Sequence, residues 1–239
     1  LSANSQDDRR VITGKINVTT SNAEILGKDL ASSYQKILEP NEGIKWTMHV
    51  PDNYDPSYPP GIIVHLSERN NAVLPFGWNS VLRDKNLIWI SLNKAGRLPQ
   101  NKEMLLTVLS TAYVESKYRV NSDRVYISSI TEGCMSASAA MQVYPSVFKG
   151  AIYTSCMPIN WKSDIPPTIE EMKKNRYVFV SGSNNALERE MRRIVKRYKS
   201  SGLEKVEHKN LPLLAYGKNL NRRRLNEYIE FLDIRDEFY

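Results

Sequence analysis

The sequence predicts an α/β fold built on a mostly parallel, doubly wound sheet. Short apolar runs rich in Val, Ile and Tyr alternate with amphipathic helical segments along most of the 239 residues. The runs after residue 60 are almost continuously hydrophobic, which is typical of strands that helices cover on both faces. Regular alternation of strands and helices is the pattern of a parallel sheet with helices on its two faces.

Seven strands are predicted, at 44–50, 61–67, 87–93, 124–130, 150–156, 177–183 and 205–211, with helices between them at about 78–86, 101–118, 133–144, 186–201 and 219–235. Turn-forming residues at 52–56 and 58–61 separate the first two strands and predict a hairpin-like, antiparallel entry to the sheet. The longer connection at 157–175 contains three prolines, and it is the expected place for a lid or a substrate-facing excursion.

Composition favours one globular domain over residues 11–239, preceded by a flexible polar segment at 1–10. The chain is 41% apolar and 25% charged, as is ordinary for soluble domains. No run approaches 18 consecutive apolar residues, so no membrane span is expected. A polar start without Met is typical of a chain whose leader was removed or left out, which predicts an exported protein, periplasmic, secreted or lipoprotein.

Positive charge gathers in two runs. Lys plus Arg exceeds Asp plus Glu by 33 − 26 = 7, and much of this excess lies at 192–199 and 222–224. A basic surface can meet nucleic acid, anionic polysaccharide or lipid headgroups. Both runs fall in helical patterns with an apolar face, so their basic side chains are expected simply to face water. Nucleic acid is not the expected partner, because the chain has no RNA-binding signature or helix-turn-helix spacing.

The segment 124-RVYISSITEGCMSASAAM-141 predicts a buried strand, a sharp turn and a helix. Its turn, 129-SITEG-133, is close to the G-x-S-x-G turn that holds a nucleophilic serine in a strained, exposed position. Ser129 stands where that motif has its first glycine. Thr131 stands where it has the serine.

With this context the sequence resembles the α/β-hydrolase superfamily, and more narrowly the secreted esterases of the polyhydroxybutyrate-depolymerase and feruloyl-esterase type. The resemblance extends from about Met48 to Leu232, and it is carried by 51-PDNY-54, 77-GW-78, 118-YRVNSDRVY-126 and 144-YPSVFKG-150. It implies a single-domain α/β-hydrolase fold with an antiparallel N-terminal hairpin.

The resemblance also assigns the catalytic positions, and none carries the family's residue. The nucleophile position falls on Thr131, and the acid of a Gly-x-x-Asp pattern falls on Asn185. The histidine position falls on Tyr216, or on Lys218 if two residues are inserted. An amide has no charge to stabilise an imidazolium, and neither Tyr nor Lys shuttles a proton near pH 7 as histidine does.

The oxyanion loop departs from the family pattern as well. His65 matches the histidine of a His-Gly pair, but Leu66 replaces the glycine that lets a backbone amide approach the reacting oxygen. His65 is otherwise expected to be a strand-end histidine bonded to backbone. Nucleophile, acid, base and oxyanion loop are altered together, which predicts an esterase-like pseudoenzyme that binds an unknown ligand or protein in the former cleft.

The alternative is a residual or novel carboxylic-ester hydrolase. In that case Thr131, or a neighbouring Ser128, Ser129 or Cys134, acts with an unrecognised base. Glu132 is expected to point into the cleft as its acidic group, or else to be an exposed turn residue.

The two cysteines, Cys134 and Cys156, are expected at the same edge of two neighbouring strands, because strands joined by one helix usually pair. That placement leaves open a disulfide or two buried thiols. No metal or other cofactor is expected, since there is no C-x-x-C spacing and nothing pairs His49 with His208 as metal ligands.

Overall fold

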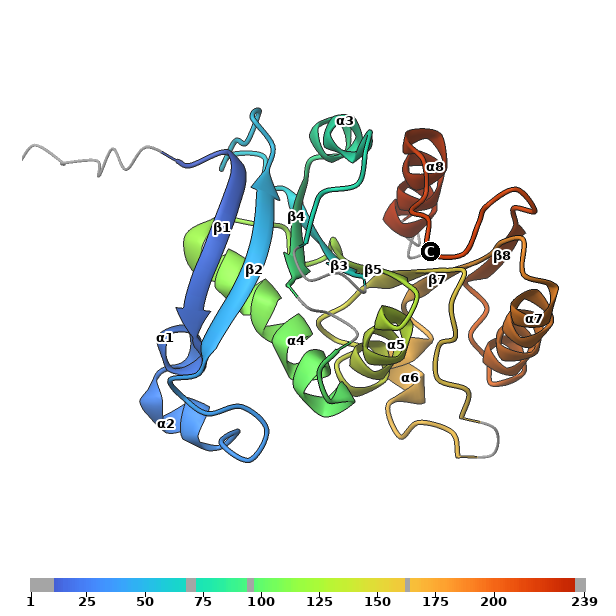
Figure 1. Ribbon diagram of the computed structural model, residues 1–239, viewed down its shortest axis with the longest axis horizontal. Coiled ribbons are helices and arrows are strands. Elements are labelled where there is room, and N and C mark those ends of the chain that lie inside the picture. Colours follow the sequence, from blue (N-terminus) through green and yellow to red (C-terminus); the bar gives the residue numbers. More distant parts are fainter. Residues whose placement is uncertain (1–10, 68–71, 94–96, 162–163, 235–239) are drawn as a thin grey trace, which may run out of the picture.

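One eight-stranded sheet forms the centre of the computed structural model, which describes residues 11–67, 72–93, 97–161 and 164–234 (Figure 1). The strands of this described part are β1 (Gly14–Ser21), β2 (Gly43–Val50), β3 (Gly61–Leu66), β4 (Leu87–Leu92), β5 (Val125–Ile130), β6 (Gly150–Thr154), β7 (Arg176–Ser181) and β8 (Val206–Asn210). Their order across the sheet is β1-β2-β4-β3-β5-β6-β7-β8. All pairs from β4 to β8 are parallel, which confirms the predicted mostly parallel sheet.

Helices cover both faces of the sheet (Figure 1). In the described residues they are α1 (Asn22–Leu26), α2 (Lys28–Ser32), α3 (Trp78–Asp84), α4 (Gln100–Lys117), α5 (Gly133–Val143), α6 (Ile169–Met172), α7 (Asn185–Ser200) and α8 (Arg222–Asp233). The apolar residues of α3 and α8 form one core with the sheet, and those of α4, α5 and α7 form the other. Strands β3 to β6 are therefore buried at every position.

The antiparallel N-terminal hairpin is present, but its strands are β1 and β2. The more specific prediction that 44–50 and 61–67 form the hairpin was wrong, because β4 lies between β2 and β3 in the sheet. Strand β1 was not predicted. It lies at the edge of the sheet, where only Val18 and Thr20 are buried, so its sequence has too few apolar residues to show a clear pattern.

The connection after β6 packs onto the helices where it is described. The Ile159 N–H donates to the Ser138 hydroxyl of α5 at 2.8 Å, and the Trp161 ring lies 4.3 Å from the ring of Tyr198 in α7. Residues 162–163 of the expected lid, and the expected flexible segment at 1–10, lie outside the described residues. Among the helices that are described, none is both long and apolar enough to span a bilayer.

Candidate functional site: the turn after β5

The turn after β5 holds a strained threonine. Strand β5 ends at Ile130 and α5 begins at Gly133, as the pattern predicted. Between them Thr131 has a φ of 50°, in the left-handed region. This conformation is unfavourable for a β-branched residue, and strain of this kind costs roughly 1–3 kcal/mol. Thr131 therefore adopts the strained backbone that a G-x-S-x-G turn imposes on its serine.

Glycine at position 133 allows α5 to start close against β3. A Cβ atom placed on Gly133 would lie 2.7 Å from the carbonyl oxygen of Leu66 and 2.8 Å from its Cβ, so no larger residue fits. The Leu66 side chain is fully buried in the core on the α4 and α5 face. Ser67 is buried as well, and residues 68–71 of the expected oxyanion loop lie outside the described part of the chain.

A cleft of about 300 Å³ opens beside this turn. It is lined by side chains from four loops and helix starts, namely Thr131, Glu132, Met135, Cys156, Met157, Asn184, Leu187 and Tyr216. Glu132 is the charged residue in this set, and the two methionines are each 41% exposed. The cleft is therefore lined by polar and apolar groups in about equal measure, and it carries one carboxylate.

The positions predicted for nucleophile and base do come together. Thr131 and Tyr216 both line the cleft. Next to Tyr216, Gly217 has a φ of 73°, and a Cβ placed on it would lie 3.7 Å from the Thr131 methyl carbon. Lys218 is exposed and does not line the cleft, and its N–H donates to the Ala215 carbonyl within the same turn.

The position predicted for the acid is displaced by one residue. Asn184, which sequence reasoning missed, lines the cleft, whereas Asn185 is exposed and is the first residue of α7. The Asn184 side chain caps α7, and its Oδ1 accepts hydrogen bonds of 3.0 Å from the N–H groups of Ala186 and Leu187. The preference of Asn for the N-cap position is the signal that could have identified it.

No imidazole meets the Thr131 hydroxyl. The Thr131 Oγ1 is buried without a hydrogen-bond partner among the described residues. The chain has three histidines, all within the described part, and none lines the cleft. His49 pairs with Asn79 at 2.7 Å and His208 with Ser181 at 3.1 Å.

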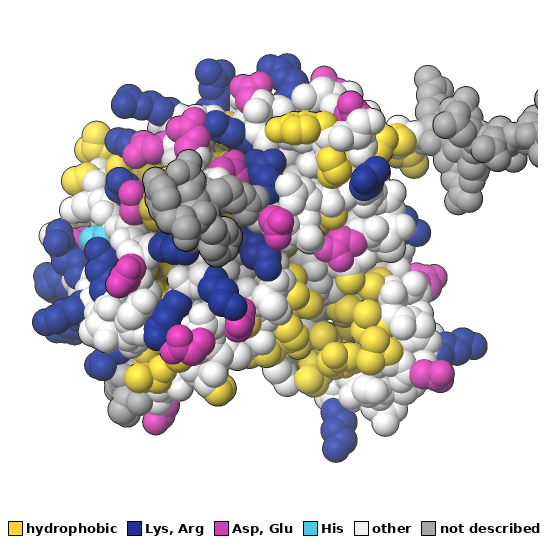
Figure 2. Space-filling model, turned by 180° about the vertical axis from the view of Figure 1, so that it is seen from behind, with side chains coloured by type: hydrophobic (Ala, Val, Ile, Leu, Met, Phe, Trp, Pro, Cys, Tyr) yellow, Lys and Arg dark blue, Asp and Glu magenta, His cyan; other side chains and the backbone are white. Residues whose placement is uncertain are grey.

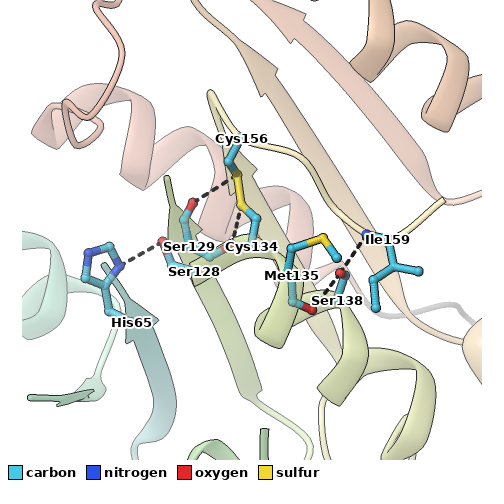
Figure 3. The surroundings of a disulfide bond; sticks show 8 residues. All are labelled: His65, Ser128, Ser129, Cys134, Met135, Ser138, Cys156 and Ile159. Atoms are coloured by element: carbon cyan, nitrogen blue, oxygen red, sulfur yellow. Dashed lines mark hydrogen bonds between the residues drawn. A yellow bond between two sulfur atoms is a disulfide. The ribbon is translucent and has the colours of Figure 1, made fainter. Parts of the chain in front are cut away.

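His65 is a core residue. Its Nδ1 lies 3.3 Å from the Ser128 hydroxyl, and both residues are 1% exposed. The ring also packs edge-on against Trp78, with centroids 4.9 Å apart. Figure 3 shows His65 and Ser128 on one side of β5 and the cysteines on the other. This serine and histidine therefore form a buried pair away from the cleft.

Cys134 and Cys156 form a disulfide (Figure 3). The two Cα atoms lie 6.0 Å apart, and β5 and β6 are paired neighbours as expected. The bond joins the first turn of α5 to the chain just after β6, and the Ser129 hydroxyl lies 3.0 Å from the Cys134 sulfur. Of the two possibilities left open, two buried thiols was wrong, and Cys134 has no thiolate with which to act as a nucleophile.

Metal-ligating side chains form no cluster in the described part of the chain. Within the described residues, no group of three or more His, Cys, Asp or Glu side chains is arranged to hold a metal ion.

No protein-family model matches the chain, and no curated protein matches it in sequence. Solved structures do match. A thermostable esterase aligns with 15% identity and a TM-score of 0.63 over 82% of this chain and 54% of its own. A feruloyl esterase module from Clostridium thermocellum, complexed with sinapinate, aligns with 11% identity and a TM-score of 0.65 over 91% of this chain and 87% of its own.

A dipeptidyl aminopeptidase IV from Bacteroides ovatus aligns with 14% identity and a TM-score of 0.62 over 94% of this chain. This chain spans about half the length of the thermostable esterase (54%) and about a third of the peptidase (36%). At such identities the similarity concerns the fold alone. The strand order, the strained turn after β5 and these structures agree: the chain has the α/β-hydrolase fold.

Proposed function

We propose that this chain is a noncatalytic, esterase-like protein of the α/β-hydrolase fold, which binds a ligand in the cleft beside Thr131. The observation that carries the proposal is the environment of the Thr131 hydroxyl, which has no hydrogen-bond partner among the described residues. Tyr216 lines the cleft at the position expected for the base.

Ester hydrolysis on this fold needs a base within hydrogen-bond reach of the nucleophile, roughly 2.6–3.2 Å away. No histidine lines the cleft, and the Asn184 side-chain oxygen is already used to cap α7. Loss of a complete serine triad lowers kcat on the order of a million-fold in well-studied hydrolases. Turnover is therefore expected to be at background.

The cleft suits a small ligand with an apolar body and a polar end. Its volume of about 300 Å³ lies at the small end of ligand sites. Met135 and Met157 offer flexible thioether side chains that adapt to different shapes, while Leu187 and Tyr216 add apolar surface. Glu132 and Asn184 supply the polar groups that would orient the ligand.

The alternative, a residual ester hydrolase, is left with one candidate among the side chains named for it. Ser128 and Ser129 are buried within β5, at 1% and 0% exposure, and Cys134 is bonded to Cys156. Thr131 alone of the four lines the cleft.

Two measurements test the proposal. Wild type and Thr131→Ala are treated with a fluorescent phosphonate ester probe and analysed by intact mass, and no covalent adduct is expected on either. An adduct on the wild type that Thr131→Ala abolishes would establish a working nucleophile and overturn the proposal.

Binding is measured separately, by calorimetry with sinapinate and related hydroxycinnamates, since sinapinate is bound to the similar feruloyl esterase module. Leu187→Trp should fill the cleft and abolish binding, whereas Val143→Trp, on an exposed face away from the cleft, should not. Binding that Leu187→Trp leaves intact would place the ligand site elsewhere.

A further inference from the structure

A strongly basic surface covers the outer side of α7. This surface, here named the α7 basic face, consists of six exposed side chains, Arg189, Arg192, Arg193, Lys196, Arg197 and Lys199. The acidic residues of the helix are Glu188 and Glu190, so α7 has a net charge of 6 − 2 = 4 out of the chain's 7. Figure 2 shows dark-blue side chains gathered at the edge of the molecule where α7 lies.

Ion pairs use only part of this charge. Arg192 pairs with Glu188, and Arg193 pairs with Glu190 at 2.9 Å. The other four members of the α7 basic face have no ion-pair partner within the described part of the chain. Like charges three or four residues apart destabilise a helix. The row of like charges on α7 therefore lowers the stability of the helix. An ordinary exposed helix face avoids this cost because it mixes positive and negative side chains.

The positive surface extends beyond the helix. The charges of the helix reach the neighbouring strand β8, where burial lowers the pKa of His208, Arg192 and Lys199 lower it further, and Glu188 opposes them. At the C-terminal end of α7, the Lys173 side chain packs against Gly202. A Cβ atom placed on Gly202 would lie 2.8 Å from the Cε atom of Lys173. Lys173 also lines a broad groove of about 980 Å³, together with Lys149, Lys174, Arg176 and Lys205 and the acids Asp123 and Glu171.

The side chains of the α7 basic face favour a polyanion over a bilayer or a single-stranded nucleic acid. Its apolar residues, Met191, Ile194, Val195 and Tyr198, all point into the core. A helix that lies in a membrane surface inserts apolar side chains, and proteins that bind single strands stack bases on exposed aromatic rings. The α7 basic face offers neither feature.

The disulfide indicates the compartment in which the protein meets a polyanion. Disulfides such as Cys134–Cys156 form and persist in oxidising compartments outside the cytosol. Sulfated and carboxylated polysaccharides are polyanions outside the cytosol, and their acidic groups are the kind that arginine recognises. Guanidinium groups bind sulfate and carboxylate oxygens through two parallel hydrogen bonds. Four of the six side chains of the α7 basic face are arginines, which suits a partner that carries such anions.

We infer that the α7 basic face binds an anionic polysaccharide, and that this site is separate from the cleft beside Thr131. From Arg189 to Lys199 the helix rises about 15 Å, so the face can contact several charged groups along one extended chain. The site would hold the protein on an acidic polymer while the cleft takes a small ligand.

Heparin and polygalacturonate are the probes, as a sulfated and a carboxylated polymer. Binding is measured by fluorescence anisotropy of labelled oligosaccharides between 50 and 200 mM salt. With about four contacts, affinity should fall on the order of a hundredfold over this range, because bound counterions are released on binding. Lys196→Glu combined with Arg197→Glu should lower affinity at 50 mM salt by about tenfold or more, since it reverses two positive charges that face the anionic polymer.

The matched control is Lys15→Glu combined with Lys36→Glu, which changes the net charge equally on exposed residues at the other end of the sheet. It should keep most of the wild-type affinity. Equal losses in the two double variants, with circular dichroism showing both folded, would mean that only net charge matters and would overturn the inference. Tighter binding to duplex DNA, or to anionic lipid vesicles, than to both polysaccharides at the same salt would overturn it too.

Discussion

Reduction of the Cys134–Cys156 disulfide should destabilise the fold by about 3 kcal/mol. The bond closes a loop with a sequence separation of 22 residues, and the loss of chain entropy on closing a loop of that size in the unfolded state gives this value at 25 °C. For a domain of about this length, 3 kcal/mol corresponds to a fall in Tm of roughly 6–12 °C.

The assay is urea unfolding followed by tryptophan fluorescence, with oxidised protein compared against protein unfolded, reduced with a phosphine and refolded under reducing conditions. The bond must be reduced in the unfolded state because Cys134 and Cys156 are 0% and 2% exposed. The double variant Cys134→Ala and Cys156→Ala is the control, and its stability should not respond to the reductant. A difference of less than about 0.5 kcal/mol between the free energies of unfolding of oxidised and reduced wild type would refute the loop-closure reasoning.

Three further predictions follow from single contacts. Gly133→Ala should destabilise the protein by about 1–3 kcal/mol in the same urea assay, because the added methyl meets the Leu66 backbone at 2.7 Å; an unchanged midpoint would contradict the close approach of α5 to β3. Asp233→Ala should cost about 2–3 kcal/mol, since it removes the partly buried partner of Arg124 (2.7 Å) and Tyr126 (2.6 Å). Glu230→Ala removes an exposed carboxylate that pairs with the half-buried Lys85, and it should change stability little; equal effects of the two variants would be inconsistent with this contrast. Burial, together with the charges of Arg192 and Lys199, lowers the pKa of His208 in the folded state. The free energy of unfolding should therefore be constant above about pH 6.5 and fall as the pH drops below that value. His208→Gln should flatten this part of the pH profile, and an unaltered slope would exclude His208 as its source.

The central strands and the turn after β5 were predictable because their sequences carry strong signals. Strands β3 to β6 are buried on both faces, so their apolar runs are continuous. Gly133 marks the start of α5, where only glycine fits against β3. The edge of the sheet was not predictable in the same way. Strand β1 is half exposed, and no local sequence signal shows that β4 lies between β2 and β3.

Two of the three triad-equivalent positions named from the sequence line one cleft. Thr131 and Tyr216 reach the same cleft because the sheet fixes the loops at the carboxyl ends of its strands. Asn184 lines the cleft in place of Asn185, since the N-cap of α7 falls one residue earlier than the spacing implied. Formation of the disulfide depends on a Cα separation of 6.0 Å, a distance that sequence spacing cannot supply.

The rate of p-nitrophenyl acetate hydrolysis at neutral pH, compared between wild type and Thr131→Ala, tests the central proposal most directly. The Thr131 hydroxyl has no hydrogen-bond partner among the described residues and no histidine lines its cleft, so the two proteins should hydrolyse the ester equally slowly, at the rate of a noncatalytic protein surface. A wild-type kcat/KM that is tenfold or more above that of Thr131→Ala, a difference of about 1.4 kcal/mol in transition-state stabilisation, would contradict the proposal and identify Thr131 as a nucleophile.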